Sequence, residues 1–252
     1  MGYLYRFRRN TDDSFDAFSN LSIEGSIYAA MKDKNEVLLE IDVDRLCKIT
    51  TIDRSIVEKT CDIIRNHILN HYFIACFAKT DQLGDLDMWK EYSNGDGFCL
   101  VYNEASITNA ICFSMMKHKD IFHMFRDVDY GFKPTDITLF VEDYLRIVGK
   151  DVQNEEAHKN ASNKVGDSFS RDIKQKITNA YFHKIGTFPE KSEKRIVSFN
   201  KNSKGPFSKD LLLEKVKPIL IIYSDKMPTD SVKRLKSIAK KNSIRVQVHH
   251  LK

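Results

Sequence analysis

The chain has 252 residues, of which 42% are hydrophobic and 30% are charged, and its formal net charge is +5. This balance is typical of soluble globular proteins, and the length allows one sizeable core without disulfide or metal staples. No apolar run approaches the roughly 20 residues that span a bilayer, and MGYLYRFRRN lacks the apolar region of a secretory signal, so we expect a cytoplasmic protein without a membrane segment.

Apolar patterns predict strands and one long helix in the first hundred residues. The segment Tyr3–Arg8 alternates apolar and polar residues, which is typical of a strand. Asp53 is placed to cap a helix that runs to about Tyr72 with one apolar stripe. A short helix over 85–92 ends at SNGDG, which is rich in helix-stopping residues. Further strands are expected at 26–31, 36–43, 72–78 and 97–102.

The second half of the chain combines helices, loops and a final strand–helix–strand unit. HMFRDVDYGF predicts an outer strand that Pro134 closes, and TDITLFVEDYLRIV has helical spacing after a Thr-Asp start. A second helix is expected over 168–185 and a strand over 194–199. Residues 149–167 are polar and irregular and predict an exposed loop, and 200–209 predict a Gly/Pro/Lys linker. The chain should then end in a strand (216–223), a helix (229–241) and a strand (244–250).

These elements form no internal repeat, and no shift in composition demands a domain boundary. We therefore predict a single α+β domain over residues 1–252, built on a mixed sheet with flanking helices. The five cysteines are odd in number and never form C-x-x-C, which excludes a disulfide framework and a zinc site. We expect them to be reduced thiols. They are Cys47, Cys61, Cys76, Cys99 and Cys112.

Positive charge concentrates toward the C-terminus. Residues 224–252 carry eight basic and two acidic side chains, and residues 184–209 carry seven and two. Such a surface suits an anionic partner such as nucleic acid or the phosphates of a dinucleotide. The alternative is a helix face that lysines make soluble. The candidate contacts to nucleic acid are Lys233, Arg234, Lys236, Lys240 and Lys241.

Short motifs follow one another in a characteristic order. LYRF stands at the start, CFAKTDQLGDLDMWKEYSNGDGFCLVY in the centre and HKIGTFPEKSEKRI near the end. Over nearly the whole length, this order resembles a widespread bacterial family of domains of unknown function. The central block carries the resemblance, and the late block departs from it, because Phe188 stands near the usual Trp and Lys191 where Glu is frequent. The family name supplies no activity.

A second resemblance concerns three positions. A first-strand Tyr-Arg, a second strand with an aromatic residue, and a late strand with Glu resemble the layout of ADP-ribosyltransferases. The resemblance implies an ADP-ribosyltransferase-like fold and NAD as the substrate. On this chain it implies that Arg6 holds the phosphates of NAD, that Tyr28 stacks on nicotinamide, and that Glu193 is the catalytic carboxylate.

Glu193 suits this chemistry. Cleavage of the bond between nicotinamide and ribose builds positive charge on the ribose, and a fixed carboxylate stabilises that charge. Glu190 is a poorer candidate, because strand alternation turns it to the opposite face. The alternative interpretation of Glu193 is a surface carboxylate paired with Lys191 or Arg195.

The first-strand candidates also have structural alternatives. Arg6 can be a strand-edge charge beside other arginines, and Tyr28 a half-buried strand residue. Tyr5 and Arg6 point to opposite faces, so only one of them can line a given pocket.

Other residues favour structural roles. Trp89 and Tyr92 share a face of a short helix, and we interpret them as core. His67 and His71 lie four residues apart but lack a third ligand, so we predict no metal site. EKSEKR lacks the spacing of a metal-dependent nuclease. His183 with Lys184 can either reach an anionic substrate or interact with a helix C-terminus.

Three functions remain open. The first is an ADP-ribosyltransferase-like enzyme that modifies a nucleic acid or a protein, in a toxin or phage-defence setting where a partner protein could neutralise it. The second is a non-catalytic nucleic-acid-binding module that uses the basic C-terminal third. The third is a metal-dependent nuclease.

Overall fold

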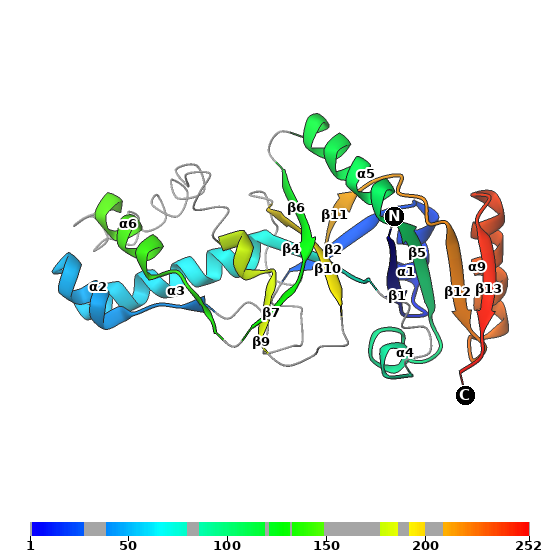
Figure 1. The fold of residues 1–252 in the computed structure, drawn as a ribbon, viewed down its shortest axis with the longest axis horizontal. Helices are drawn as coiled ribbons and strands as arrows, with labels where there is room; N and C mark the ends of the chain where they lie inside the picture. Colours follow the sequence, from blue (N-terminus) through cyan, green and yellow to red (C-terminus); the bar gives the residue numbers. More distant parts are fainter. Residues whose placement is uncertain are drawn as a thin grey trace.

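A long sheet runs through the middle of the molecule, with helices on both of its faces (Figure 1). The computed structural model describes residues 2–27, 39–79, 86–118, 121–131, 133–148, 177–185, 192–199 and 209–251. At one end of the view lie α2 (Val43–Thr50), α3 (Arg54–His71) and α6 (Thr138–Val148), and at the other end lies α9 (Thr229–Lys241).

Nine strands in the described part of the chain form the main sheet. Its order is β11-β2-β4-β1-β5-β12-β13, and β10 and β6 extend it from β4. Within this sheet β12 and β13 run parallel, whereas the other pairs are antiparallel. The strands are β1 (Tyr3–Arg8), β2 (Ile23–Ile27), β4 (Tyr72–Ala78), β5 (Phe98–Asn103), β6 (Phe122–Asp127), β10 (Glu193–Phe199), β11 (Lys209–Leu213), β12 (Leu220–Ser224) and β13 (Arg245–His249).

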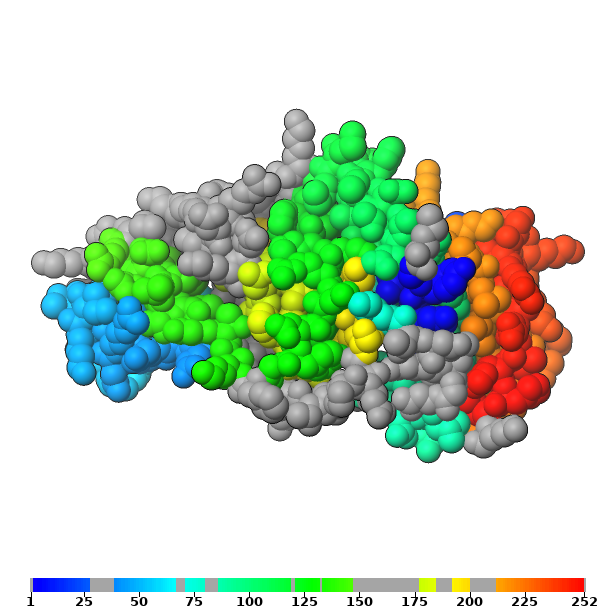
Figure 2. All heavy atoms as spheres, viewed as in Figure 1, coloured from blue at the N-terminus to red at the C-terminus, as the bar shows by residue number. Residues whose placement is uncertain are grey.

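Short elements complete the architecture. Two small parallel pairs stand outside the main sheet: β3 (Leu39–Glu40) with β8 (Thr135–Asp136), and β7 (Asp129–Gly131) with β9 (His183–Ile185). The remaining helices are α1 (Asp12–Ser19), α4 (Leu86–Ser93) and α5 (Glu104–Lys117). In the space-filling view, the green atoms of 121–131 lie against yellow atoms of the segments that carry β9 and β10 (Figure 2).

The main sheet divides at β4. One edge of β4 pairs with β10 along its whole length, from Tyr72 to Ala78. The other edge is shared, because β2 pairs with it at Phe73 and Ile74, and β1 meets it at Ala78. Between these contacts β1 and β2 diverge from each other.

Strand alternation assigns each side chain to one face of the sheet. On the first face, Leu4, Phe77 and Ile196 belong to a core that α1, α5 and α9 cover. On the second face, Ile74 and Val197 pack under α2, α3 and α6. Farther along this second face, Trp89 of α4 packs against Cys99 and Val101, with Tyr5 and Phe7 beside it.

The predicted α+β class with a mixed sheet is confirmed, and several elements have their predicted bounds. β1 and β4 cover the segments 3–8 and 72–78, and α9 covers 229–241. Asp53 caps α3, where its carboxylate accepts a hydrogen bond from the Ser55 amide at 2.9 Å. Val57, Cys61 and Ile64 of the predicted stripe are buried.

Other predictions are wrong. The strand expected over 36–43 is present only as β3, since residues 36–38 lie outside the described ones and α2 begins at Val43, where Asp42 caps a helix by accepting from the Arg45 amide at 2.9 Å. Residues 183–185 form β9 and not the end of a helix. The predicted β2 and β12 segments begin at the wrong residue. The sequence interpretation did not include α1, α5 or β11.

Some predictions lie outside the described residues. These are the loop over 149–167, the first part of the helix expected over 168–185, Tyr28, and the linker over 200–209 except for Lys209, where β11 begins. The single-domain organisation stays a prediction. Among the described helices, none is long and apolar enough to cross a membrane.

Gly97 lies just before β5, against the backbone at the end of β1. A Cβ atom at this position would overlap the Arg8 carbonyl oxygen and approach Ser93, whereas a Cβ atom at Gly131 would meet nothing within 4 Å. We therefore expect Gly97→Ala to destabilise the fold by about 1–3 kcal/mol through overpacking. Gly131→Ala, the matched control, should be neutral or slightly stabilising. Urea unfolding curves of both variants check this, and equal midpoints would contradict it.

Candidate active site

Three strands bring one row of residues together on the second face of the sheet. Ala78 of β4 stands opposite Tyr5 of β1 and opposite Glu193 of β10. Neighbouring strands lie about 4.8 Å apart, so the Cα atoms of Tyr5 and Glu193 are roughly 10 Å apart. This row lies between the core under α2, α3 and α6 and the core under α4.

Glu193 is held by a buried arginine. Both oxygens of its carboxylate accept hydrogen bonds from Arg195, at 2.6 Å from Nε and 3.2 Å from the terminal nitrogen. Arg195 is completely buried and also donates to the Tyr181 carbonyl at 2.8 Å. Residues i and i+2 of a strand share a face, which explains the pairing. The alternative interpretation, in which Glu193 pairs with Lys191 or Arg195, expected this ion pair. The Glu193 side chain is 18% exposed.

The carboxylate of Glu193 is ionised at neutral pH. Burial alone would raise its pKa, but the charge and the hydrogen bonds of Arg195 outweigh burial. The Cys76 thiol and the Lys184 ammonium act in the same direction, so the pKa lies below its ordinary value. The group is therefore an oriented anion that solvent can reach.

Tyr92 and Lys184 belong to the same neighbourhood. Burial raises the pKa of the Tyr92 hydroxyl, the charges of Glu91 and Glu193 raise it further, and Lys184 opposes them. Trp89 is completely buried, which confirms its interpretation as core, but Tyr92 is exposed and turns out of that core. Sequence reasoning named Arg195 as a possible partner of Glu193, and the structure confirms that pair. It missed Cys76, because that contact depends on the pairing of β4 with β10.

Arg6 lies on the opposite face from Glu193. Its neighbour Leu4 is in the first-face core, and its guanidinium stands 5.6 Å from the centre of the Phe77 ring. It donates to the Glu24 carbonyl of β2 at 2.5 Å. Burial, followed by the nearby Arg8 charge, lowers its pKa to about 10. The structure therefore does not bring Arg6 and Glu193 together; Arg6 bridges the gap where β1 and β2 diverge.

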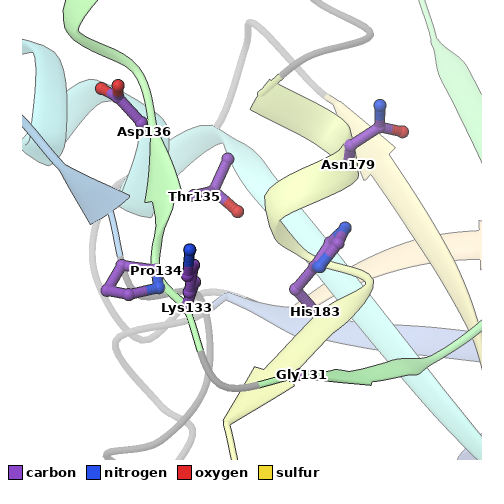
Figure 3. A pocket seen from close by; sticks show the side chains of 7 residues that line it. All are labelled: Gly131, Lys133, Pro134, Thr135, Asp136, Asn179 and His183. Carbon is purple, nitrogen blue, oxygen red and sulfur yellow. The ribbon is translucent and has the colours of Figure 1, made fainter.

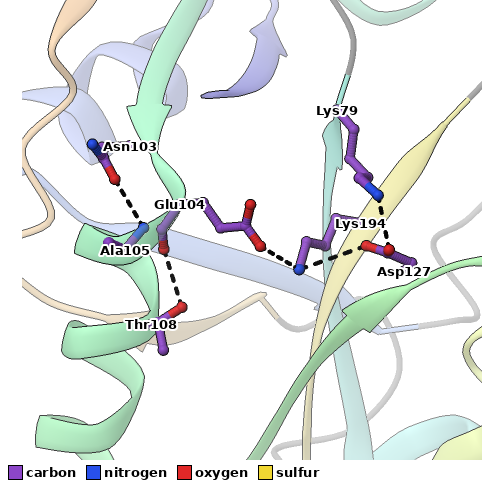
Figure 4. Close-up of polar contacts among 7 residues, drawn as sticks. All are labelled: Lys79, Asn103, Glu104, Ala105, Thr108, Asp127 and Lys194. Carbon is purple, nitrogen blue, oxygen red and sulfur yellow. Dashed lines mark hydrogen bonds and ion pairs between the residues drawn. The ribbon is translucent and has the colours of Figure 1, made fainter. Parts of the chain in front are cut away.

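A second charged cluster occupies the first face (Figure 4). Lys194 donates to Glu104 at 2.5 Å and lies 3.6 Å from Asp127, which also binds Lys79 at 2.8 Å. The Lys194 ammonium stands 4.6 Å from the centre of the Phe125 ring. These contacts tie α5 to β4, β6 and β10.

The basic residues of α9 have different surroundings. Arg234 binds Asp12 at 2.5 Å and Asp16 at 3.2 Å, so it fastens α9 to α1. Lys233 pairs with Asp230, and Lys236 lies over the Tyr223 ring. Lys240 and Lys241 are exposed in the last turn. Nucleic-acid binding by this helix stays a prediction. Arg234 already forms ion pairs with α1.

The histidines do not form a metal site in the described chain. His71 stacks on Phe199 with ring centres 6.2 Å apart. No group of three or more His, Cys, Asp or Glu side chains within the described ranges could hold a metal ion.

No family model, no curated protein and no solved structure matches this chain. The resemblance to the bacterial domain family stays a prediction. Function is therefore inferred from the site's own residues.

Acid should weaken the Glu193–Arg195 pair. The pKa of Glu193 is lower in the folded chain than its ordinary value of 4.5, so its contribution to stability is complete above pH 4.5 and disappears as pH falls through the folded pKa. We expect Glu193→Gln to flatten the pH dependence of the unfolding free energy below pH 4.5. Urea unfolding from pH 3 to pH 7 checks this, and parallel curves would contradict it.

Removing the arginine should have a larger effect. Arg195→Met leaves the Glu193 carboxylate without its buried partner, and breaking such a pair costs about 3–5 kcal/mol. Thermal unfolding measures the loss. Because Arg54 pairs with Asp44 at the exposed surface, Arg54→Met is the matched control and should cost at most about 1 kcal/mol.

Proposed function

We propose that this chain is an ADP-ribosyltransferase-like enzyme that cleaves NAD and transfers ADP-ribose to a nucleic acid or a protein. The observation that supports it is the row of Tyr5, Ala78 and Glu193 on one face of the sheet, with an ionised carboxylate at its end. In this proposal Glu193 stabilises the positive charge that develops on the ribose.

The orientation of Glu193 suits that role. Arg195 fixes both carboxylate oxygens, so the anion is preorganised and needs no rearrangement during the reaction. Each carboxylate oxygen has two lone pairs, and one remains available for a ribose hydroxyl. The bond between the ribose carbon and the nicotinamide nitrogen breaks with its electrons leaving on nicotinamide, and a nucleophile of the acceptor then bonds to that carbon and loses its proton.

Aromatic and cationic groups lie beside the carboxylate. Tyr5 and the exposed Tyr92 offer ring faces on which nicotinamide can stack. Arg6 is directed to the other face, so it cannot contact the phosphates of NAD bound beside Glu193. In this proposal Lys184, whose charge acts on Glu193, contacts them instead. Tyr28 lies outside the described residues and keeps only its predicted role. The ADP-ribosyltransferase-like fold, the toxin or phage-defence setting and the neutralising partner are parts of the same proposal.

Nicotinamide release from NAD tests the proposal. We expect release by the wild type in the presence of RNA, DNA or cell extract, and a loss of about 100-fold or more in kcat for Glu193→Gln, because the developing charge loses its anion. Glu91→Gln removes an exposed carboxylate of α4 and should keep the activity. Chromatographic quantification of nicotinamide measures both.

Folding must be separated from chemistry. Glutamine retains an oxygen that can accept from Arg195, so Glu193→Gln should keep cooperative unfolding at neutral pH. Equal release by a folded Glu193→Gln variant, or no release by folded wild type with every acceptor, would overturn the proposal. A steep loss of nucleic-acid binding with salt, without NAD cleavage, would favour the binding module instead.

A further inference from the structure

A cavity lies beside the β7–β9 pair (Figure 3). Its volume is about 620 Å³, within the range of small-molecule sites. β9 separates it from the candidate active site, because alternation turns His183 into the cavity and Lys184 to the other face, where its charge acts on Glu193. The lining residues are Gly131, Lys133, Pro134, Thr135, Asp136, Asn179 and His183.

The cavity presents mainly hydrogen-bond donors. Arg126 donates to the Asn179 amide oxygen at 2.7 Å, which fixes the orientation of that amide and leaves its two N–H donors turned away from Arg126. The Lys133 ammonium, the Thr135 hydroxyl and the His183 ring add further donors.

The acidic group in the lining is already engaged. Asp136 accepts from the Thr138 amide at 2.8 Å and so caps α6. Its negative charge is directed to a helix N-terminus, which stabilises it. The donors in the lining therefore suit a ligand rich in acceptor oxygens, such as a phosphate.

The size of the cavity points to more than a phosphate. A lone phosphate would leave most of this volume empty, and the Pro134 ring provides apolar wall. A flat heterocyclic base on a ribose fits an apolar wall, while its phosphate satisfies the donors.

We propose that this cavity binds a nucleoside monophosphate unit, with the phosphate on Lys133, Asn179 and His183. The unit can be the adenylate half of a dinucleotide or one nucleotide of a nucleic acid. Binding does not depend on the proposed NAD cleavage, so each can fail without the other.

Saturable binding of free nucleoside monophosphates (AMP, GMP, CMP and UMP), measured by calorimetry, tests the site. Gly131 and His183 lie on the same face of the β7–β9 pair, and a Cβ atom at Gly131 meets nothing within 4 Å. Gly131→Leu should therefore fill the cavity and abolish binding while the fold stays intact. Gly131→Ala should bind like the wild type.

An added negative charge provides a second variant. Asn179→Asp keeps an oxygen for Arg126 but replaces two donors with an anion, so binding should weaken about tenfold or more. Asn109→Asp adds the same charge on the exposed face of α5 and should leave binding unchanged. Glu193→Gln should also bind like the wild type.

Competition identifies the source of the ligand. Displacement of the bound monophosphate by NAD favours the dinucleotide, and displacement by a short RNA favours the nucleic acid. Inorganic phosphate and adenosine should each compete only weakly. Absence of saturable binding for all four monophosphates, or unchanged binding by folded Gly131→Leu and Asn179→Asp variants, would overturn the proposal.

Discussion

The division of the sheet at β4 is the constraint on which the rest of the structure depends. One edge of a strand cannot pair with two neighbours at the same residues. β1 therefore pairs with β4 at Ala78, and β2 pairs with it at Phe73 and Ile74. The backbone groups in the intervening gap need other partners. Arg6 supplies one by donating to the Glu24 carbonyl across the gap. A guanidinium suits this position because it offers several donors in one plane and also lies over the Phe77 ring.

Strand alternation then sorts the charges of β10 onto the two faces. Glu193 and Arg195 lie on the second face, and Lys194 between them lies on the first. The dense charge of EKR is therefore not a solvated stretch, since Arg195 is completely buried and Lys194 nearly so. Each of the three residues has an opposite charge within reach, which is the condition for burying charges at acceptable cost. Two separate polar sites follow from three consecutive residues.

The sequence was sufficient where a local pattern decides the structure. The alternation of β1, the apolar run of β4 and the cap at Asp53 each depend on a few neighbouring residues. It failed where the deciding partner is distant. The partner of Arg6 is a backbone carbonyl 18 residues away, which has no side-chain signature.

α5 was missed because Phe113 and Met116 are exposed, so its apolar residues do not form one stripe. α1 had a readable signal in Thr11 followed by two aspartates, which was not used. In the candidate site, the sequence pointed to Glu193. The position of Ala78 beside it depends on the register of three strands, which the sequence alone does not show.

The Arg234 contacts have a consequence for how the chain forms in the cell. α9 and α1 are joined across 222 and 218 residues of sequence, and Leu235 and Ala239 complete the same core as Leu4 and Phe15. During synthesis β1 and α1 are made long before α9, so the part of their core that Leu235 and Ala239 complete stays uncovered until α9 is made. Contacts of such long sequence separation make folding slow and leave apolar surface exposed meanwhile. β1 and α1 therefore complete their packing only after α9 is made, and a chaperone that shields the apolar surface of β1 and α1 should raise the yield of folded protein.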